Sequence, residues 1–374
     1  MPLRAVARVD VGAIERNVAS LRERLAGGAR LCAVVKADGY GHGAVPAARA
    51  AQAGGAEWLA VATAEEAREL RVAGIDGTVL VLGALSETDL PVALAADAEV
   101  VAWREGFLAG LASAGKPVRV HVKLDTGMGR LGTRDPDEAG RVAEAVAGHP
   151  TLTLAGLMTH FATADDRRDP FFAEQLERFT AWAAPLKAAR PEVALHAANS
   201  AAALREPGAH FDAVRAGIAV YGLDPFGEDP AAHGLEPALE LASYVAEVKP
   251  CAAGQSVGYG RRFLAPSDTI VATLPIGYGD GVRRGLTNNA AVLVDGRRRP
   301  LVGTVSMDNV TLDLGPDGGG VRRGDEAVLI GARGGERILA EEVARRLDTI
   351  NYEVTCGISV RVPRVHHRGG ELVA

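Results

Sequence analysis

The sequence predicts an α/β protein in which an N-terminal (β/α)8 TIM barrel precedes a smaller, mostly β C-terminal domain. The chain has 374 residues, which is too long for a single small hydrophobic core. Through about the first 220 residues, short apolar runs alternate with helical patterns, as in parallel α/β folds. Beyond Pro237, glycine-rich turns separate the apolar runs instead. We therefore expect the barrel over residues 10–236 and the β domain over 237–374, which residues 1–9 could join.

The barrel prediction depends on the number of strands. Eight apolar, β-branched runs precede Pro237, at residues 31–35, 58–62, 78–82, 99–102, 118–124, 152–158, 193–197 and 213–215. Eight strand–helix units fit a (β/α)8 barrel. A doubly wound open sheet has the same alternation, so it stays an alternative at this point.

Helix boundaries are marked by the residue types that favour them. In the first helical stretch, apolar residues recur on one helical face, namely Ile14, Val18, Leu21 and Leu25. Asp10 stands at the position of an N-cap. Thr63 and Glu66 have the spacing of a capping box, and Pro136 after Asp135 is typical of a first helical position.

The C-terminal part has the pattern of a sheet with tight turns. Apolar runs occur at residues 270–274, 291–294, 301–305 and 327–330. An Asp-Gly pair at 295–296 is typical of a two-residue hairpin, and residues 317–320 form another glycine-rich turn. Only one clear helix is expected here, over residues 339–347.

Composition restricts the classes of function. The net charge of −6 gives no basic excess that would recruit nucleic acid or an anionic membrane. No apolar run approaches the roughly 20 residues of a membrane helix, and the N-terminus has no signal-peptide pattern. The three cysteines, Cys32, Cys251 and Cys356, form neither a disulfide framework nor a metal motif. We expect a cytoplasmic protein without a metal site.

Lys36 is the first residue in the chain whose position suggests a role in catalysis. It follows the apolar run 31–35, and glycines stand at 39, 41 and 43. At the C-terminal end of a barrel strand it would lie on the face where barrels have their active sites. Apolar neighbours would lower the pKa of the amine and leave it able to attack an aldehyde. Taken alone, Lys36 could equally leave the strand into solvent.

From residue 33 to residue 353, a series of segments resembles the alanine racemase family. Residues 33–43 are similar to the family's cofactor-lysine motif. The other similar segments, in chain order, lie at 121–132, 159–162, 198–200, 214–222, 257–261, 275–281, 305–308 and 350–353. Each is weak alone, but together and in order they are specific. The tail at 357–364 departs slightly from the family pattern, and no expected site residue lies in it.

The resemblance implies a pyridoxal 5'-phosphate enzyme that interconverts L- and D-alanine and supplies D-alanine for peptidoglycan synthesis. It implies that Lys36 carries the cofactor as a Schiff base and acts as one proton-transfer base. Tyr259 would be the second base, contributed by the partner subunit of a homodimer with composite active sites. One base on each face of the α-carbon removes and returns a proton without moving the substrate.

The same resemblance implies roles for four cationic or titratable residues. Arg215 would face the pyridine nitrogen of the cofactor, and because arginine only donates, that nitrogen would stay unprotonated. His160 would back Arg215. Arg130 would lie near the phenolic oxygen of the cofactor and the substrate carboxylate. Lys123 would correspond to the lysine that many family members carbamylate to orient this arginine.

The remaining implied residues hold the cofactor and the substrate. Further cofactor contacts are expected from Tyr40, Asn199, Ser200, Gly217, Ile218 and Tyr352. Gly217 and Ile218 follow the eighth predicted strand, a common phosphate position in barrels. On the substrate side, the resemblance implies Met307 from the partner subunit, with Tyr278 and Asp308 around the entrance.

Three alternatives remain open from the sequence. A broader-specificity amino-acid racemase would differ in the size of its substrate pocket. A decarboxylase of the same barrel class fits the tyrosine and arginine motifs less well. A non-catalytic pyridoxal-phosphate carrier would resemble the barrel alone and would not need a C-terminal domain with Tyr259, Tyr278 and Met307.

Overall fold

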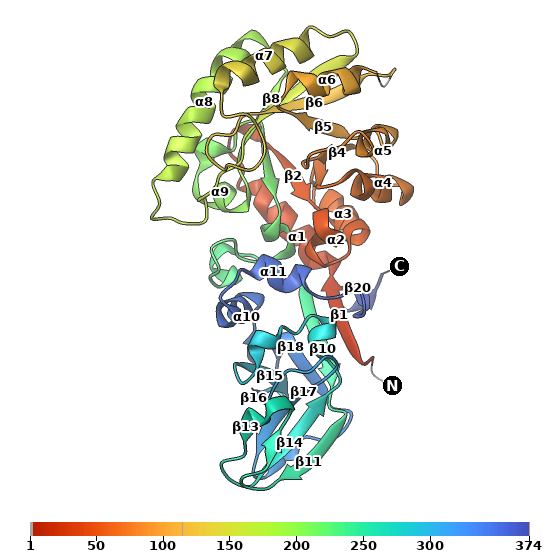
Figure 1. Ribbon diagram of the computed structural model, residues 1–374, viewed down its shortest axis with the longest axis vertical. Helices are drawn as coiled ribbons and strands as arrows, with labels where there is room; N and C mark the ends of the chain where they lie inside the picture. The colour runs from red at the N-terminus through yellow and green to blue at the C-terminus, as the bar shows by residue number, and fades with distance from the viewer. Residues whose placement is uncertain (1–2, 114, 374) are drawn as a thin grey trace. The chain divides into compact units, whose positions relative to one another are not determined.

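The computed structural model describes residues 3–113 and 115–373 (Figure 1). These residues form two compact units. One unit contains Ile14–Phe226, and we call it the barrel unit. The other, which we call the β unit, combines the described residues up to Ala13 with those from Gly227 onward. The domain boundary expected between residues 236 and 237 stays a prediction.

The barrel unit is built on a closed ring of parallel strands, β2 to β9 in chain order. Their bounds are Arg30–Val34, Trp58–Val61, Thr78–Val81, Glu99–Ala102, Val118–Lys123, Leu152–Met158, Ala194–His196 and Ala213–Ala216. β9 pairs with β2 and closes the ring, so the predicted TIM barrel is confirmed and the doubly wound alternative is wrong. All eight predicted runs are strands, and each predicted end lies within one residue of the observed end.

Helices follow the strands around this ring (Figure 1). Helices α1 to α9 span Val11–Glu23, Lys36–Tyr40, Ala44–Ala53, Ala64–Val72, Asp89–Ala95, Glu105–Ala112, Pro136–Ala147, Phe171–Ala189 and Ser200–Arg205. Three predicted caps are confirmed. Asp10 Oδ1 accepts from Gly12 N at 2.9 Å, Thr63 begins α4 with a complete capping box, and Pro136 opens α7 after Asp135.

The β unit contains one large sheet, and the predicted mostly β domain is confirmed. Its strands run in the order β11-β14-β17-β16-β15-β18-β10-β1-β20-β21, with β19 paired to β18. The bounds in that order are Glu247–Cys251, Thr269–Leu274, Val310–Gly315, Arg297–Val302, Ala290–Val294, Glu326–Arg333, Leu239–Tyr244, Ala5–Asp10, Arg364–Arg368, Glu371–Leu372 and, for β19, Glu336–Ile338. Strands β12 (Ser256–Val257) and β13 (Phe263–Leu264) form a separate pair.

Two expectations for the β unit were wrong in detail. The strand predicted at 301–305 is β16 and ends at Val302, because Gly303 turns the chain at φ 78°. Its first half is arginine-rich and pairs with β15 through the predicted Asp295-Gly296 hairpin. Helix α10 (Ala340–Leu347) is confirmed, but α11 (Asn351–Cys356) follows it. Six residues are too few for a helical period to be recognised.

Helix length also bears on membrane insertion. Among the described residues, no helix combines the length and the apolar character that crossing a membrane requires.

Candidate active site

Lys36 lies just after β2, where the backbone enters a left-handed turn. Ala37, Asp38 and Gly39 have φ/ψ of 52/51°, 52/49° and 60/43°, and Tyr40 has φ 54°. For residues other than glycine this conformation costs about 1–2 kcal/mol each. Such strain persists where the surrounding structure enforces it, and it is concentrated at functional sites.

Glu66 on α4 holds this turn from outside. Its Oε1 accepts from Ala37 N at 2.7 Å. Its Oε2 accepts from Ala62 N at 2.7 Å and from Thr63 N at 3.1 Å. One carboxylate therefore caps α4 and fixes the residue that follows Lys36. The sequence predicted only the capping role of Glu66.

Arg215 on β9 is 3% exposed and is held by five hydrogen bonds. Nη1 contacts His196 Nδ1 at 2.9 Å and donates to His196 O at 2.8 Å. Nη2 donates to Thr159 O at 2.8 Å and Ala197 O at 3.1 Å, and it contacts His160 Nδ1 at 3.2 Å. Among the described residues these contacts occupy both terminal amino groups and leave the Nε–H without a partner. Burial lowers the pKa of Arg215 to about 10.

Two histidines therefore contact Arg215, and the sequence predicted only His160. His196, at the end of β8, makes the shorter contact and was missed. Burial, followed by the positive charge of Arg215, lowers the pKa of both histidines well below the ordinary value. Both are therefore neutral and able to accept a hydrogen bond from the arginine.

Four cations converge at the C-terminal end of the barrel strands. Lys123 ends β6 and is 4% exposed. Burial, together with the charges of Arg215, Arg130 and Lys36, lowers its pKa to about 8, against the opposing effect of Asp125. A cluster with this excess of positive charge favours an anionic ligand.

Tyr40, Ser200 and Gly217, three of the expected cofactor contacts, lie close together, and Ile218 follows Gly217 in the chain. A Cβ on Gly217 would lie 2.4 Å from Tyr40 Oη, so only glycine lets the tyrosine approach. Ser200 Oγ accepts from Gly217 N at 2.9 Å and from Ala219 N at 3.3 Å, which leaves its hydroxyl proton available to an anion. Ile218 begins the short helix η3 (Ile218–Tyr221).

Asn199 lies directly before this group, at the N-terminus of α9. Its side chain accepts from Ala202 N at 3.0 Å and so caps the helix that begins with Ser200. The cap fixes the position of Ser200 beside Gly217.

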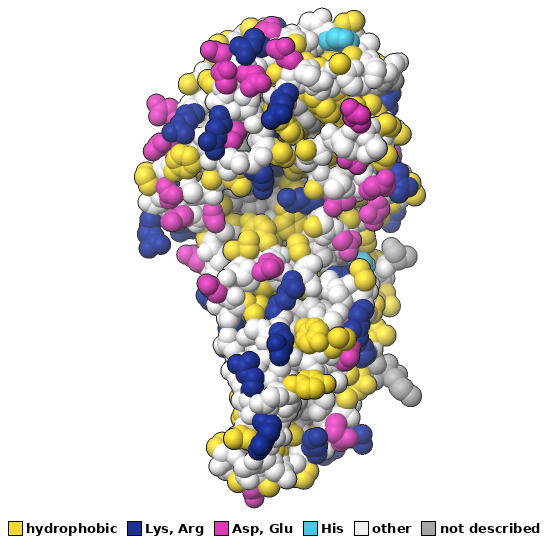
Figure 2. Space-filling view, in the orientation of Figure 1, with side chains coloured by type: hydrophobic (Ala, Val, Ile, Leu, Met, Phe, Trp, Pro, Cys, Tyr) yellow, Lys and Arg dark blue, Asp and Glu magenta, His cyan; other side chains and the backbone are white. Residues whose placement is uncertain are grey.

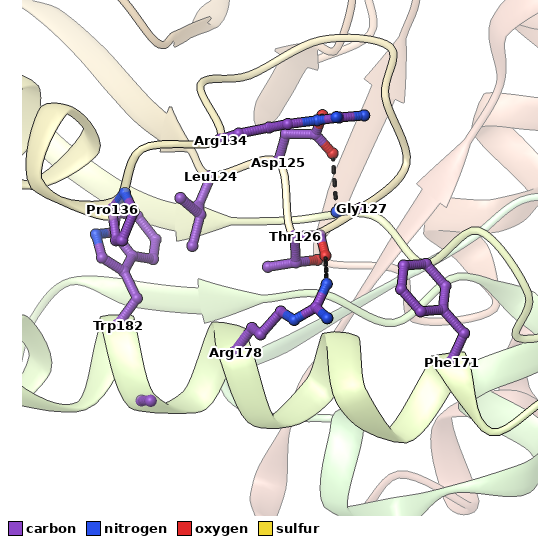
Figure 3. Close-up of a pocket in the computed structure, with 10 residues that line it drawn as sticks. Leu124, Asp125, Thr126, Gly127, Arg134, Pro136, Phe171, Arg178 and Trp182 are labelled. Atoms are coloured by element: carbon purple, nitrogen blue, oxygen red, sulfur yellow. Dashed lines mark hydrogen bonds and ion pairs between the residues drawn. The ribbon is translucent and has the colours of Figure 1, made fainter.

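The loop after β6 carries Arg130 and is braced by α8. Asp125 Oδ1 accepts from Gly127 N and Gly129 N, each at 3.0 Å. Arg178 of α8 donates to Thr126 O at 3.0 Å. Figure 3 shows this contact and the one between Asp125 and Gly127 among the residues that line a cavity of about 700 Å³. None of the residues that line this cavity is a predicted site residue.

Arg130 itself lines a different cavity. This cavity measures about 360 Å³, and Trp103 and Phe107 lie on its wall with Arg130. Because Arg130 also acts electrostatically on Lys123, we place the site at this loop and not in the larger cavity.

The other predicted site residues belong to the β unit, where two turns are bonded together. Tyr278 N donates to Ser306 O at 2.9 Å, and Gly279 N donates to Met307 O at 2.9 Å. A Cβ on Gly277 would lie 2.3 Å from Ser306 O, so this close approach requires glycine.

Asp308, Tyr259 and Tyr352 complete this group. Arg361 holds Asp308 Oδ1 at 2.7 Å. The carbonyl of Tyr259, in helix η5 (Tyr259–Arg261), accepts from Thr304 Oγ1 at 2.6 Å. Tyr352 lies on α11.

Large side chains in this group are unusually exposed. Tyr259 is 74% exposed, Met307 51% and Tyr278 43%. Figure 2 shows hydrophobic side chains on the visible surface of the β unit among basic side chains. Exposed apolar side chains that gather in this way mark interaction surfaces. The predicted site residues thus form two groups, one in each unit.

Comparison with known proteins gives a consistent result for both parts of the chain. A family model described as "Alanine racemase, N-terminal domain" matches residues 9–225, and one described as "Alanine racemase, C-terminal domain" matches residues 238–366. An alanine racemase of Symbiobacterium thermophilum is 46% identical over 371 residues, which cover 98% of this chain and 97% of the relative.

Solved structures agree with this. The alanine racemase of Streptomyces lavendulae has a TM-score of 0.92 at 40% identity, and the match covers 99% of this chain and 98% of that one. The Bacillus anthracis alanine racemase with bound L-Ala-P has a TM-score of 0.90 at 37% identity, covering 100% and 98%.

Proposed function

The chain belongs to the alanine racemase family and is an isomerase that interconverts L- and D-alanine, and we propose that it uses pyridoxal 5'-phosphate held by Lys36 in sites shared between two subunits. We further propose that its product D-alanine serves peptidoglycan synthesis. The match over residues 238–366 contradicts the alternative of a carrier that resembles the barrel alone.

The observation that carries the cofactor proposal is the environment of Arg215. The five hydrogen bonds of this buried guanidinium leave only its Nε–H for a ligand. Lys36 and Arg130 add positive charge in the same part of the barrel unit. A group with an acceptor nitrogen, an anionic ring oxygen and a phosphate suits these donors, and the hydroxyls of Tyr40 and Ser200 suit the phosphate.

Each residue then has a defined task. Pyridoxal phosphate, when bound, supplies an aldehyde for a lysine amine and a ring that withdraws electrons from the α-carbon. Arg215 would donate to the ring nitrogen and leave it unprotonated, which would limit side reactions such as transamination. Lys36 Nζ takes or returns the α-proton on one face. Tyr259 of the partner subunit does so on the other.

The substrate carboxylate is bound by two groups in this proposal. Arg130 pairs with it from the loop after β6, and the backbone amide of Met307 of the partner subunit donates to it. Tyr278 and Asp308 line the entrance. The bonded turns that carry Tyr278 and Met307 support a common task for these residues.

Lys123, once carbamylated, would carry the negative charge that orients Arg130. A buried lysine with a pKa of about 8 has an appreciable neutral fraction near neutral pH. The neutral amine can react with carbon dioxide, and the resulting carbamate is an anion amid three cations. We therefore propose that Lys123 is carbamylated.

The decisive experiment follows the optical rotation of L-alanine with the purified protein and pyridoxal phosphate. We expect the rotation to decay to zero, and Lys36→Ala to abolish the decay. L-Serine, assayed in parallel, addresses the broader-specificity alternative: a comparable rate would favour it. An unchanged rotation of L-alanine with the cofactor demonstrably bound would contradict the proposed function.

A further inference from the structure

A chain of hydrogen bonds crosses the interior of the barrel unit from Arg215 to Glu99. Arg215 Nη1 lies 2.9 Å from His196 Nδ1, and His196 Nε2 lies 2.8 Å from His121 Nδ1. His121 Nε2 lies 2.5 Å from Glu99 Oε2. Barrel interiors are ordinarily filled with branched apolar side chains. Here four polar side chains, none more than 5% exposed, occupy that space and depend on one another for partners.

The backbone is shaped to let this chain form. His121 on β6 and His196 on β8 are not on neighbouring strands. On β7, which lies between them, Gly156 leaves the space: a Cβ there would lie 2.4 Å from His121 Nδ1. The register of β6 and β7 also shifts between Val120 and His121. Trp58 of β3 packs edge-on against both imidazoles, at centroid distances of 5.9 and 5.8 Å.

The positions of the protons follow from the chemistry of the two ends. Arginine has no acceptor, so His196 Nδ1 must accept from Arg215. A neutral His196 then carries its proton on Nε2 and donates to His121 Nδ1. His121 in turn carries its proton on Nε2 and donates to the Glu99 carboxylate. One assignment of tautomers therefore satisfies every contact in the chain.

The charges agree with this assignment. Burial favours the neutral form of Glu99, but hydrogen bonds from His121 and Arg119 outweigh it and lower the pKa of the carboxyl. Burial and the charge of Arg215 lower the pKa of His196 well below its usual value. The chain therefore has a cation at one end and an anion at the other, and the hydrogen-bond assignment above leaves one proton on each imidazole between them.

We propose that Glu99 and His121 are positioning residues for Arg215. The Glu99 carboxylate fixes both histidines as Nε2–H tautomers, and the histidines then hold the guanidinium so that its Nε–H is left for the cofactor ring. Reversed tautomers would place a His196 N–H against an arginine N–H and displace the guanidinium. The inference rests on the proposed function, in which Arg215 faces the ring nitrogen.

The first test reads the tautomers directly. In the cofactor-loaded protein labelled with 15N-histidine, NMR distinguishes protonated from unprotonated ring nitrogens. We expect His121 and His196 each to have a protonated Nε2 and an unprotonated Nδ1. A protonated Nδ1 on either one in the wild-type protein would overturn the proposal. This readout does not depend on activity or on any variant.

The second test replaces Glu99, the carboxylate at the end of the chain of hydrogen bonds. Glu99→Gln keeps the shape but offers either an oxygen or an NH2 group to His121. We expect mixed tautomers and a fall in kcat of about tenfold, the lower end of the effect of outer hydrogen-bond partners of metal ligands. KM for alanine should stay within about twofold, because Arg215 is not a substrate ligand. The control is Arg119→Gln, which removes the exposed partner of the same carboxylate and should leave tautomers and kcat unchanged.

The outcomes of these tests distinguish a failure of the positioning role from a failure of the proposed function. Wild-type tautomers and kcat in Glu99→Gln would show that Glu99 is not a positioning residue. If the Glu99→Gln variant does not fold, the tautomers measured in the wild-type protein test the proposal on their own. The expected tautomers in a protein that fails to racemise alanine would support the chain and contradict the proposed function.

Discussion

Burial changes the chemistry of Lys123 enough to be measured. Its pKa is lowered from 10.5 to about 8, so its neutral fraction rises as the pH rises through about 8. We expect 13C-bicarbonate to give a carbamate NMR signal that grows between about pH 7 and 9. The signal should be absent in Lys123→Gln. A signal that persists in this variant would place the modification on another amine.

Glu66 shows how one side chain can keep a strained turn in place. Glu66→Ala removes the acceptor of three backbone amides. We expect a loss of about 1–3 kcal/mol in the free energy of unfolding, together with faster hydrogen exchange at the Ala37 amide. Weaker retention of pyridoxal phosphate should accompany it, because Ala37 adjoins Lys36.

Glu65→Ala is the matched control for that prediction. Glu65 is the preceding residue on the same helix, and its ion pair with Arg68 is 61% exposed on both sides. Exposed pairs of this kind contribute about 0–1 kcal/mol. If both alanine variants behave alike, the effect belongs to α4 and not to the turn.

At the scale of elements, Gly156 shows how a strand accommodates the residues beside it. A methyl group on this residue of β7 would lie 2.4 Å from His121 Nδ1 and 3.0 Å from Ala194 O. We expect Gly156→Ala to destabilise the protein by about 1–3 kcal/mol, as overpacking does. Denaturant unfolding measures the change.

Gly140→Ala provides the comparison. Gly140 lies inside α7, and nothing lies within 4 Å of where its Cβ would be. The substitution should stabilise the helix by up to about 1 kcal/mol. Equal destabilisation by both substitutions would show that the contact with His121 is not the cause.

Elements whose signals are local could be predicted from the sequence. Apolar runs between turn residues predicted the barrel strands. Asp10, Thr63 and Pro136 predicted helix starts, because capping acts between residues no more than three apart. The first half of β16 carries arginines at 297–299 and no apolar alternation, so its strand character comes from pairing with β15. Pairing across a sheet leaves no local signal.

At the scale of the whole molecule, the proposal of composite sites predicts complementation. Lys36→Ala subunits and Tyr259→Phe subunits should each be strongly impaired alone. After unfolding and joint refolding, half of the dimers are mixed, and each would have one site with both bases intact. We expect about a quarter of wild-type activity in the mixture. No recovery would contradict the proposal that the two bases come from different subunits.

Candidate site residues could be named from the sequence where a motif contains them, but contacts between distant strands could not be predicted. Lys36, Arg215 and Ser200 stand within contiguous segments that resemble the family. The His196 contact with Arg215 joins residues 19 positions apart, and the His121 contact with His196 joins residues 75 positions apart. A lone histidine in a strand predicts neither contact, because only closure of the barrel brings these residues together.

The pairing of β1 has a consequence for synthesis on the ribosome. β1 lies between β10 and β20 in the sheet, and both partners follow the entire barrel sequence in the chain. The barrel unit is therefore translated, and free to close, while this early strand still has both edges unpaired. An unpaired apolar strand is a site for wrong association. We therefore expect the nascent chain to be prone to association through this strand until β10 has emerged.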